Sequence, residues 1–169
     1  MKKILALIMV SLLLFSVCAC ESTSTVSSEQ SDESAKESGL QSFKIGDEIF
    51  IKNDDGEYKF TITEVKETSD RNEFADENPL KVILVSYTYE NISLSDDLYI
   101  DDMSFSAYDK NNNKMDSYPA DIKYPDSVSS GRKCSAEMAF GLDSEENYVE
   151  LEFYDNMFLD ADCKIILEW

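Results

Sequence analysis

Apolar and polar residues alternate along most of the chain after residue 42. In residues 58–63 every second position is apolar, which predicts a strand with one buried face. The preceding run, residues 48–52, is joined to it through residues 53–56, Asn-Asp-Asp-Gly, and an Asp-Gly pair suits the positive φ of a tight hairpin. The sequence therefore predicts that these two strands pair.

The longest apolar run, residues 80–89, has large apolar side chains on both faces of a strand, which is typical of a central strand. No helical periodicity of useful length interrupts the alternating pattern. Further strands are predicted over residues 103–108, 114–118, 132–140, 148–154 and 164–169. Seven or eight short strands in about 130 residues indicate one all-β domain, an antiparallel sandwich.

The first 19 residues have the pattern of a signal peptide. Two lysines precede an apolar run at residues 4–17, and the small residue Ala19 precedes Cys20. The run is too short to span a bilayer as a stable helix, which favours a cleaved signal. The stretch resembles a bacterial lipoprotein signal peptide, in which the cysteine receives acyl chains (palmitate) and becomes the first residue of the mature protein. We therefore expect anchoring at Cys20 to the extracytoplasmic face of the cell membrane.

Cys18 competes with Cys20 for the lipid, but Val17 stands before it where a small residue is wanted. An ordinary secretory signal with an incidental cysteine is the alternative. Residues 20–42 follow, rich in serine and glutamate and poor in apolar residues. Such a segment cannot bury enough apolar surface to fold, so we interpret it as a flexible tether, in which residues 21–40 span about 25 Å as a coil. The folded domain is predicted to cover residues 43–169.

The composition is strongly acidic. The whole chain has a net charge of −20, and removing the signal peptide takes away two lysines and no acid, which leaves −22. This charge disfavours nucleic acid and anionic lipid head groups as partners and favours cationic partners and divalent ions. Histidine is absent, which removes the usual general base and every Ser-His or Cys-His nucleophile.

Cys134 and Cys163 are the cysteines left outside the membrane. Each shares a strand face with apolar residues at alternate positions, so both thiols are predicted to point into the core. An oxidising location permits a disulfide between them, which would contribute about 3.5 kcal/mol in the chain-entropy model. Two buried, unpaired thiols are the alternative.

Acidic residues form the candidate metal ligands. Asp96, Asp97, Asp101 and Asp102 surround a short apolar stretch, and clustered carboxylates can bind calcium or, at the right separation, hydrolyse a glycoside. Adjacent acids on turns are more often simply solvated. Residues 109–113 begin like a calcium-binding EF-hand loop, but the turn glycine and the acid at position 12 are missing. A hairpin turn explains the asparagines there.

Tyrosines form a second candidate feature. Tyr118 and Tyr124 each precede a proline, and Tyr99 and Tyr108 lie on the same half of the chain. An aromatic patch flanked by acids would suit a cationic peptide or the face of a sugar. A stiff connection whose tyrosines cover the end of the core is the alternative.

The order of these segments resembles the telokin-like, immunoglobulin-like domain of unknown function found in surface lipoproteins of Gram-positive bacteria. The resemblance is carried by residues 44–48, 81–91, 103–115 and 130–133 with Ala139-Phe140, and it covers nearly all of residues 43–169. It implies an immunoglobulin-like fold and a surface location, and no reaction.

Together these observations favour a membrane-tethered sandwich that is no enzyme and acts by binding an extracytoplasmic protein, peptide or wall component. A calcium-binding or calcium-stabilised surface module is the alternative, and a carboxylate-dependent hydrolase is a remote one.

Overall fold

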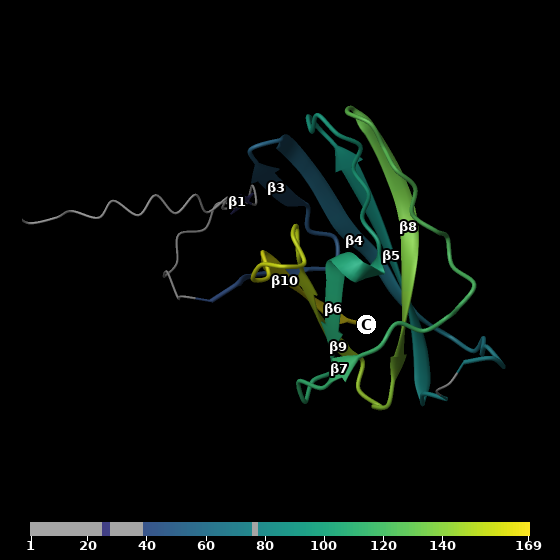
Figure 1. Cartoon of the computed structure of the whole chain (residues 1–169). Helices are drawn as coiled ribbons and strands as arrows, with labels where there is room; N and C mark the ends of the chain where they lie inside the picture. Colours follow the sequence, from purple (N-terminus) through teal and green to yellow (C-terminus); the bar gives the residue numbers. More distant parts are fainter. Residues whose placement is uncertain (1–24, 28–38, 76–77) are drawn as a thin grey trace, which may run out of the picture.

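The computed structural model describes residues 25–27, 39–75 and 78–169. Two sheets pack face to face as a β-sandwich (Figure 1). Sheet A has the strand order β1 (Thr25–Ser27), β3 (Ile49–Asn53), β4 (Gly56–Thr68), β5 (Lys81–Asn91) and β8 (Arg132–Leu142). Sheet B has the order β2 (Gln41–Lys44), β10 (Cys163–Glu168), β9 (Tyr148–Phe153), β6 (Phe105–Tyr108) and β7 (Lys114–Met115).

The strands predicted from alternation are all present, so the predicted immunoglobulin-like β-sandwich is confirmed. β3 and β4 pair as an antiparallel hairpin in which Asn53 faces Gly56, as the Asp-Gly signal predicts. Gly56 has a φ of 140°, and a side chain there would meet the Ser93 carbonyl oxygen at 2.5 Å. The turn therefore requires glycine for two reasons: the backbone adopts a positive φ, and the Ser93 carbonyl leaves no room for a side chain.

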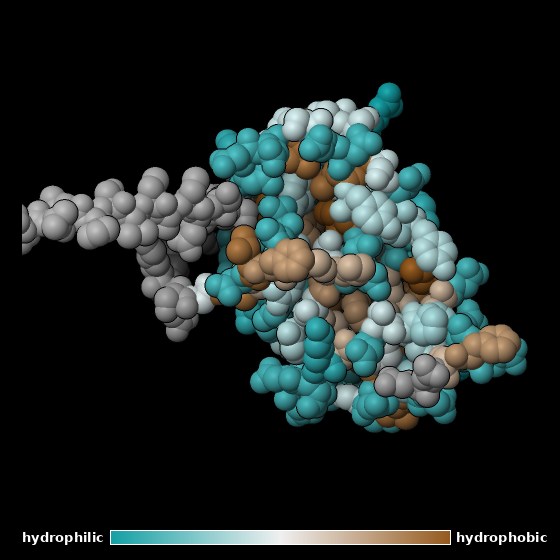
Figure 2. Space-filling model, viewed as in Figure 1, coloured by the Kyte–Doolittle hydropathy of each residue, from teal (hydrophilic) through white to brown (hydrophobic). Residues whose placement is uncertain are grey.

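Aromatic rings from both sheets fill the core. Phe60 of β4 contacts Phe105 of β6 and Phe153 of β9, with ring centroids 5.8 and 4.3 Å away. Tyr87 of β5 also contacts Phe105. These contacts place β4 opposite β9 and β6, and β5 opposite β6 (Figure 1). Hydrophilic residues cover most of the face drawn in Figure 2.

The prediction that β5 is covered on both faces is also confirmed. Its inward residues belong to the main core, whereas Val82 packs on the outer face with Tyr118 and Ala139. The segment before β8 runs along that strand's edge, because Tyr118 N donates to Ala139 O at 2.8 Å and Glu137 N donates to Lys123 O at 2.8 Å. This connection protects a sheet edge that would otherwise expose unpaired backbone groups.

Two strands correct the sequence interpretation. β1 lies inside the predicted tether of residues 20–42 and pairs with the edge of β3. β2 begins at Gln41, before the predicted domain start, and pairs parallel to β10, so the sandwich is not purely antiparallel. Low apolar content hides β1, which pairs through its backbone at an exposed sheet edge, whereas β2 places one residue, Phe43, in the core.

The predicted signal peptide and Cys20 lie outside the described residues. Among the residues described, no helix is long and apolar enough to cross a membrane.

Strand directions define two ends of the sandwich. The turn between β3 and β4, the connection from β5 to β6, and the loop from β9 to β10 meet at one end, which we call the cleft end. The connections from β4 to β5 and from β8 to β9, together with Trp169, lie at the opposite end, which we call the far end.

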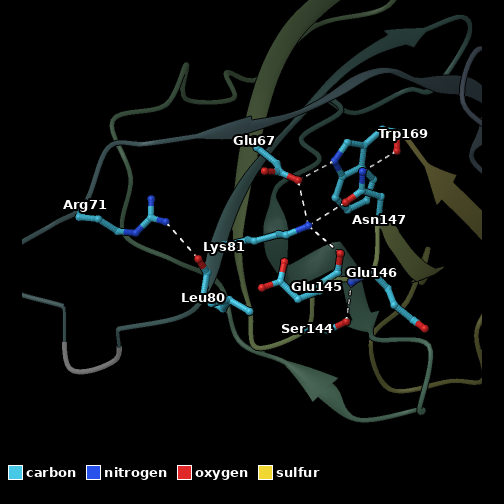
Figure 3. A network of polar contacts seen from close by, with 9 residues as sticks. All are labelled: Glu67, Arg71, Leu80, Lys81, Ser144, Glu145, Glu146, Asn147 and Trp169. Carbon is cyan, nitrogen blue, oxygen red and sulfur yellow. Dashed lines mark hydrogen bonds and ion pairs between the residues drawn. The ribbon is translucent and has the colours of Figure 1, made fainter.

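Lys81 holds the far end together (Figure 3). Its ammonium group donates to Glu145 O and Asn147 Oδ1, each at 2.8 Å, and lies 3.2 Å from Glu67 Oε1. Asn147 in turn donates to the carbonyl of Trp169, whose ring nitrogen lies 3.4 Å from Glu67. The far end is thereby closed by polar contacts.

Candidate functional site

A cleft of about 210 Å³ opens at the cleft end. Its wall is built by three stretches of chain far apart in sequence, and Ile92 N and Ser93 N fasten two of them by donating to Glu57 O. Acidic, aromatic and apolar residues line it: Asn53, Asp55, Tyr58, Leu94, Asp96, Asp97, Leu98, Tyr99, Ile100, Ser104, Phe153, Tyr154 and Asp155. No basic residue appears among these lining residues.

Asp155 forms the fixed side of the cleft. Tyr58 Oη donates to one of its carboxylate oxygens at 2.5 Å, and Asn53 Nδ2 donates to the other at 3.2 Å. Burial, together with the charge of Asp155, raises the pKa of Tyr58 far above its usual range, so the phenol stays protonated and keeps donating. Both oxygens of Asp155 are therefore held by neighbours, and this carboxylate orients the cleft.

Asp55, Asp96 and Asp97 form the open side. All three are exposed, and none takes part in an ion pair within the described parts of the chain. Asn91 positions the stretch that carries two of them, because its buried amide donates to Asp96 O at 2.9 Å and to Val128 O at 3.2 Å. The same side chain accepts from Leu94 N at 2.9 Å, so one residue fixes the whole bend.

The four aspartates predicted as metal candidates separate in space. Asp96 and Asp97 line the cleft, whereas Asp101 caps a short 3₁₀ turn (Asp102–Ser104) by accepting from Met103 N at 3.0 Å, and Asp102 begins that turn. In the parts of the chain that the structure describes, no three acidic or cysteine side chains are close enough to hold a metal. The calcium hypothesis therefore finds no ligand set among these residues.

The loop that resembles an EF-hand is a hairpin turn, as expected. Asp109 accepts from Asn111 N and Asn113 N, each at 2.8 Å, and Asn112 adopts a left-handed φ of 63°. The side chain of Asn113 also donates to Asp109, and these hydrogen bonds lower the pKa of the Asp109 carboxyl group. The carboxylate of Asp109 therefore makes its hydrogen bonds within its own turn.

The tyrosines do not form one patch. Tyr99 lines the cleft with half of its surface exposed. Its pKa is raised, mainly by partial loss of solvent and also by the negative charges of Asp101 and Asp102. Tyr118 is buried against sheet A, where its hydroxyl accepts from Asn72 N at 2.8 Å. Tyr154, also in the cleft, has its pKa raised to about 12 by burial and by its hydrogen bond to Glu152.

The predicted disulfide is absent, because Cys134 and Cys163 are both free thiols. Both face inward as expected, but they belong to opposite sheets: β8 lies beyond β5, and β10 lies on the side of β9 away from β6. Alternation fixes the face of each thiol, whereas strand order decides whether two inward thiols meet. Burial, with Asp162 alongside, raises the pKa of Cys163 to about 12, so it behaves as a small apolar residue.

Sequence reasoning missed two of the cleft acids, Asp55 and Asp155, and found the other two for their local density. Asp55 lies in the predicted hairpin turn, and Asp155 directly follows a predicted strand. The sequence did contain a signal for them. Asp55 and Asp155 each stand beside the end of a predicted strand, and strand ends from both sheets meet at the same end of a sandwich.

Comparisons with known proteins agree with this architecture. The family model DUF4352, a domain of unknown function, matches residues 43–164. No curated protein matches the sequence significantly. The crystal structure of MPT63, a secreted protein from Mycobacterium tuberculosis, is similar with a TM-score of 0.59 and 12% identity, over 79% of this chain and 100% of that one.

Two Bacillus subtilis structures share the fold as well. The protein ycdA, assigned as a lipoprotein, has a TM-score of 0.53 and 16% identity, over 66% of this chain and 36% of its own. The protein yjhA has a TM-score of 0.51 and 18% identity, over 75% of this chain and 98% of its own. At these identities the similarity concerns the fold.

Proposed function

The chain belongs to the DUF4352 family of domains of unknown function, and from this premise we propose that it is an extracytoplasmic module that binds a cationic segment of a peptide or protein. The observation that carries the proposal is the cleft, where exposed carboxylates stand beside a half-exposed tyrosine and no basic residue is among the lining residues. The role assigned to the domain is binding, with no catalytic step.

The chemistry of the cleft suits an ammonium or guanidinium group. Asp55, Asp96 and Asp97 supply carboxylate oxygens for charge-assisted hydrogen bonds. Tyr99 supplies a ring face for the cation and for the methylene groups that carry it. Because sheet strands and the Asn91 bend hold these residues in place, little ordering is needed when the partner binds.

The protein is proposed to act at the membrane surface, anchored by acyl chains on Cys20. The sequence pattern of the first 20 residues supports this anchor, and an assigned lipoprotein and a secreted protein among the structural relatives agree with an extracytoplasmic setting. Without its signal peptide the module has an overall charge of −22, which also attracts cationic partners from a distance.

A titration with defined peptides tests the proposal. The mature protein is mixed with a fluorescent lysine-rich peptide and, separately, with a peptide of equal length in which serine replaces lysine, and anisotropy is recorded. We expect binding of the lysine peptide alone. Asp96→Asn combined with Asp97→Asn should weaken it about tenfold or more, since two charge-assisted contacts are removed.

The matched control is Asp70→Asn combined with Asp121→Asn. These acids are exposed and lie outside the cleft, so the control removes the same charge. Its affinity should stay within about threefold of the unmodified protein. Equal losses in the two double variants would show that only the overall charge attracts the peptide, and the cleft would lose its role.

A further inference from the structure

Exposed apolar side chains gather at the cleft end. The described residues include ten large apolar side chains that are exposed, and seven of them lie at this end: Leu40, Ile92, Tyr99, Met103 and the consecutive trio Met157, Phe158 and Leu159. The trio forms the tip of the loop from β9 to β10, where Phe158 is 88% exposed. In Figure 2, apolar atoms stand out from the surface where this loop lies in Figure 1. Such a concentration marks a contact surface.

Two hydrogen bonds to Asn156 hold the loop tip in an outward shape. Asn156 accepts from Phe158 N through its side chain at 3.0 Å and from Leu159 N through its carbonyl at 2.9 Å. These bonds close a tight turn before β10. The three apolar residues therefore project together rather than folding back on the sandwich.

The N-terminal segment joins the domain at the same end. β2 runs parallel to β10, and its first residue, Gln41, is paired with Cys163, which directly follows the loop. β1 also begins there, because Thr25 is paired with Lys52 beside the turn between β3 and β4. The first residues of β1 and β2 therefore both lie at the end of the sandwich that carries the apolar loop (Figure 1).

Little chain separates the proposed anchor from β1. Only four residues lie between Cys20 and Thr25, so their Cα atoms can be at most about 18 Å apart. While β1 stays paired with β3, acyl chains on Cys20 hold the cleft end within that distance of the bilayer surface. Phe74 and Trp169 lie at the far end, on the opposite side of the sandwich from this attachment.

We propose that the loop Met157-Phe158-Leu159 docks into the interface of the bilayer to which the protein is anchored, which fixes the orientation of the sandwich on the membrane. This inference rests on the lipid anchor proposed above and goes beyond the binding role of the cleft. The three side chains would enter the boundary between head groups and acyl chains, a layer about 5–10 Å deep. Asp160 and the cleft acids repel anionic head groups, so the docking favours zwitterionic lipid.

Two tryptophan variants provide a matched test. Phe158→Trp places a reporter in the loop, and Phe74→Trp places one at the far end, where Phe74 is similarly exposed at 84%. Each full-length protein, purified with its lipid, is reconstituted into phosphatidylcholine vesicles with or without brominated acyl chains, which quench tryptophan on contact. The native Trp169 gives the background from the far end. Flotation with the vesicles, compared with a Cys20→Ala variant, reports the anchor.

We expect brominated lipid to quench the added emission of Phe158→Trp at least twofold and to leave Phe74→Trp unchanged. Replacing part of the phosphatidylcholine by phosphatidylglycerol should reduce the quenching. If brominated lipid quenched the two variants equally, or quenched neither, while the protein still floated with the vesicles, the docking would be overturned and the anchor would stay intact. A blue shift of Phe158→Trp without bromine quenching would assign the loop to a contact with a second copy, which also overturns the proposal. Absence of flotation would remove the anchor and the inference with it.

Discussion

At the scale of single residues, Lys81 is the side chain whose loss should cost most at the far end. It is only 14% exposed and makes two hydrogen bonds and an ion pair that connect β5 to β4 and to the connection between β8 and β9. Lys81→Met keeps the length of the side chain and removes these contacts, so we expect it to lower the free energy of unfolding by about 2 kcal/mol. Urea denaturation followed by fluorescence measures this directly.

Lys66→Met is the matched control for that experiment. Lys66 is 51% exposed and lies 4.0 Å from Glu64, a surface pair in the same sheet. Its replacement should change the free energy of unfolding by less than about 0.5 kcal/mol. If both substitutions cost the same, the polar network at the far end contributes nothing beyond an ordinary surface charge.

Residue chemistry was readable from the sequence wherever a single strand or turn decided it. The inward faces of Cys134 and Cys163 and the left-handed asparagine in the turn at residues 109–113 followed from local pattern alone. Their partners did not follow, because the distance between two strands depends on the order of strands in each sheet. That is why the disulfide prediction was wrong and why Asp55 and Asp155 were not assigned to a common cleft.

At the scale of elements, β1 decides how closely the domain is held to its anchor. Replacing Thr25, Val26 and Ser27 by proline removes every backbone donor of this strand, so its pairing with β3 should be lost. We expect faster amide hydrogen exchange in the peptide that contains β3, measured by mass spectrometry, and little change in β5.

A control for the strand replaces Thr25 by valine and Ser27 by threonine, which keeps all donors and favours extended structure. Exchange in β3 should then equal that of the unmodified protein. Unchanged exchange in the proline variant would mean that the segment does not protect β3, and the distance limit between Cys20 and the domain would no longer hold.

The eight strands with alternating or apolar sequence were predictable. β1 and β2 were not, because both are short edge strands without a run of alternating apolar residues, although Phe43 of β2 reaches the core.

At the scale of the whole molecule, repulsion among the many acidic side chains destabilises the folded state. The mature protein, of net charge −22, repels itself in the folded state, and the residues that line the cleft include carboxylates and no basic side chain. Salt screens such repulsion over about 10 Å at 0.1 M ionic strength. The class of fold and the sign of this charge could both be read from the sequence, whereas the cleft arises from connections that meet only in three dimensions.

The melting temperature should therefore rise by several degrees when sodium chloride is increased from about 20 mM to about 500 mM, as screening relieves the repulsion. Calcium and magnesium at equal low concentrations should raise it equally, within about 1 °C, because screening depends on ionic charge and no described group of acids forms a cage for one ion. Scanning calorimetry of the mature protein with each salt, after treatment with a chelator, makes the comparison. A rise of several degrees with calcium alone would instead establish a specific site by mass action and restore the calcium hypothesis. Equal rises would show that the acidic residues affect stability through their overall charge, which salt screens without a specific site.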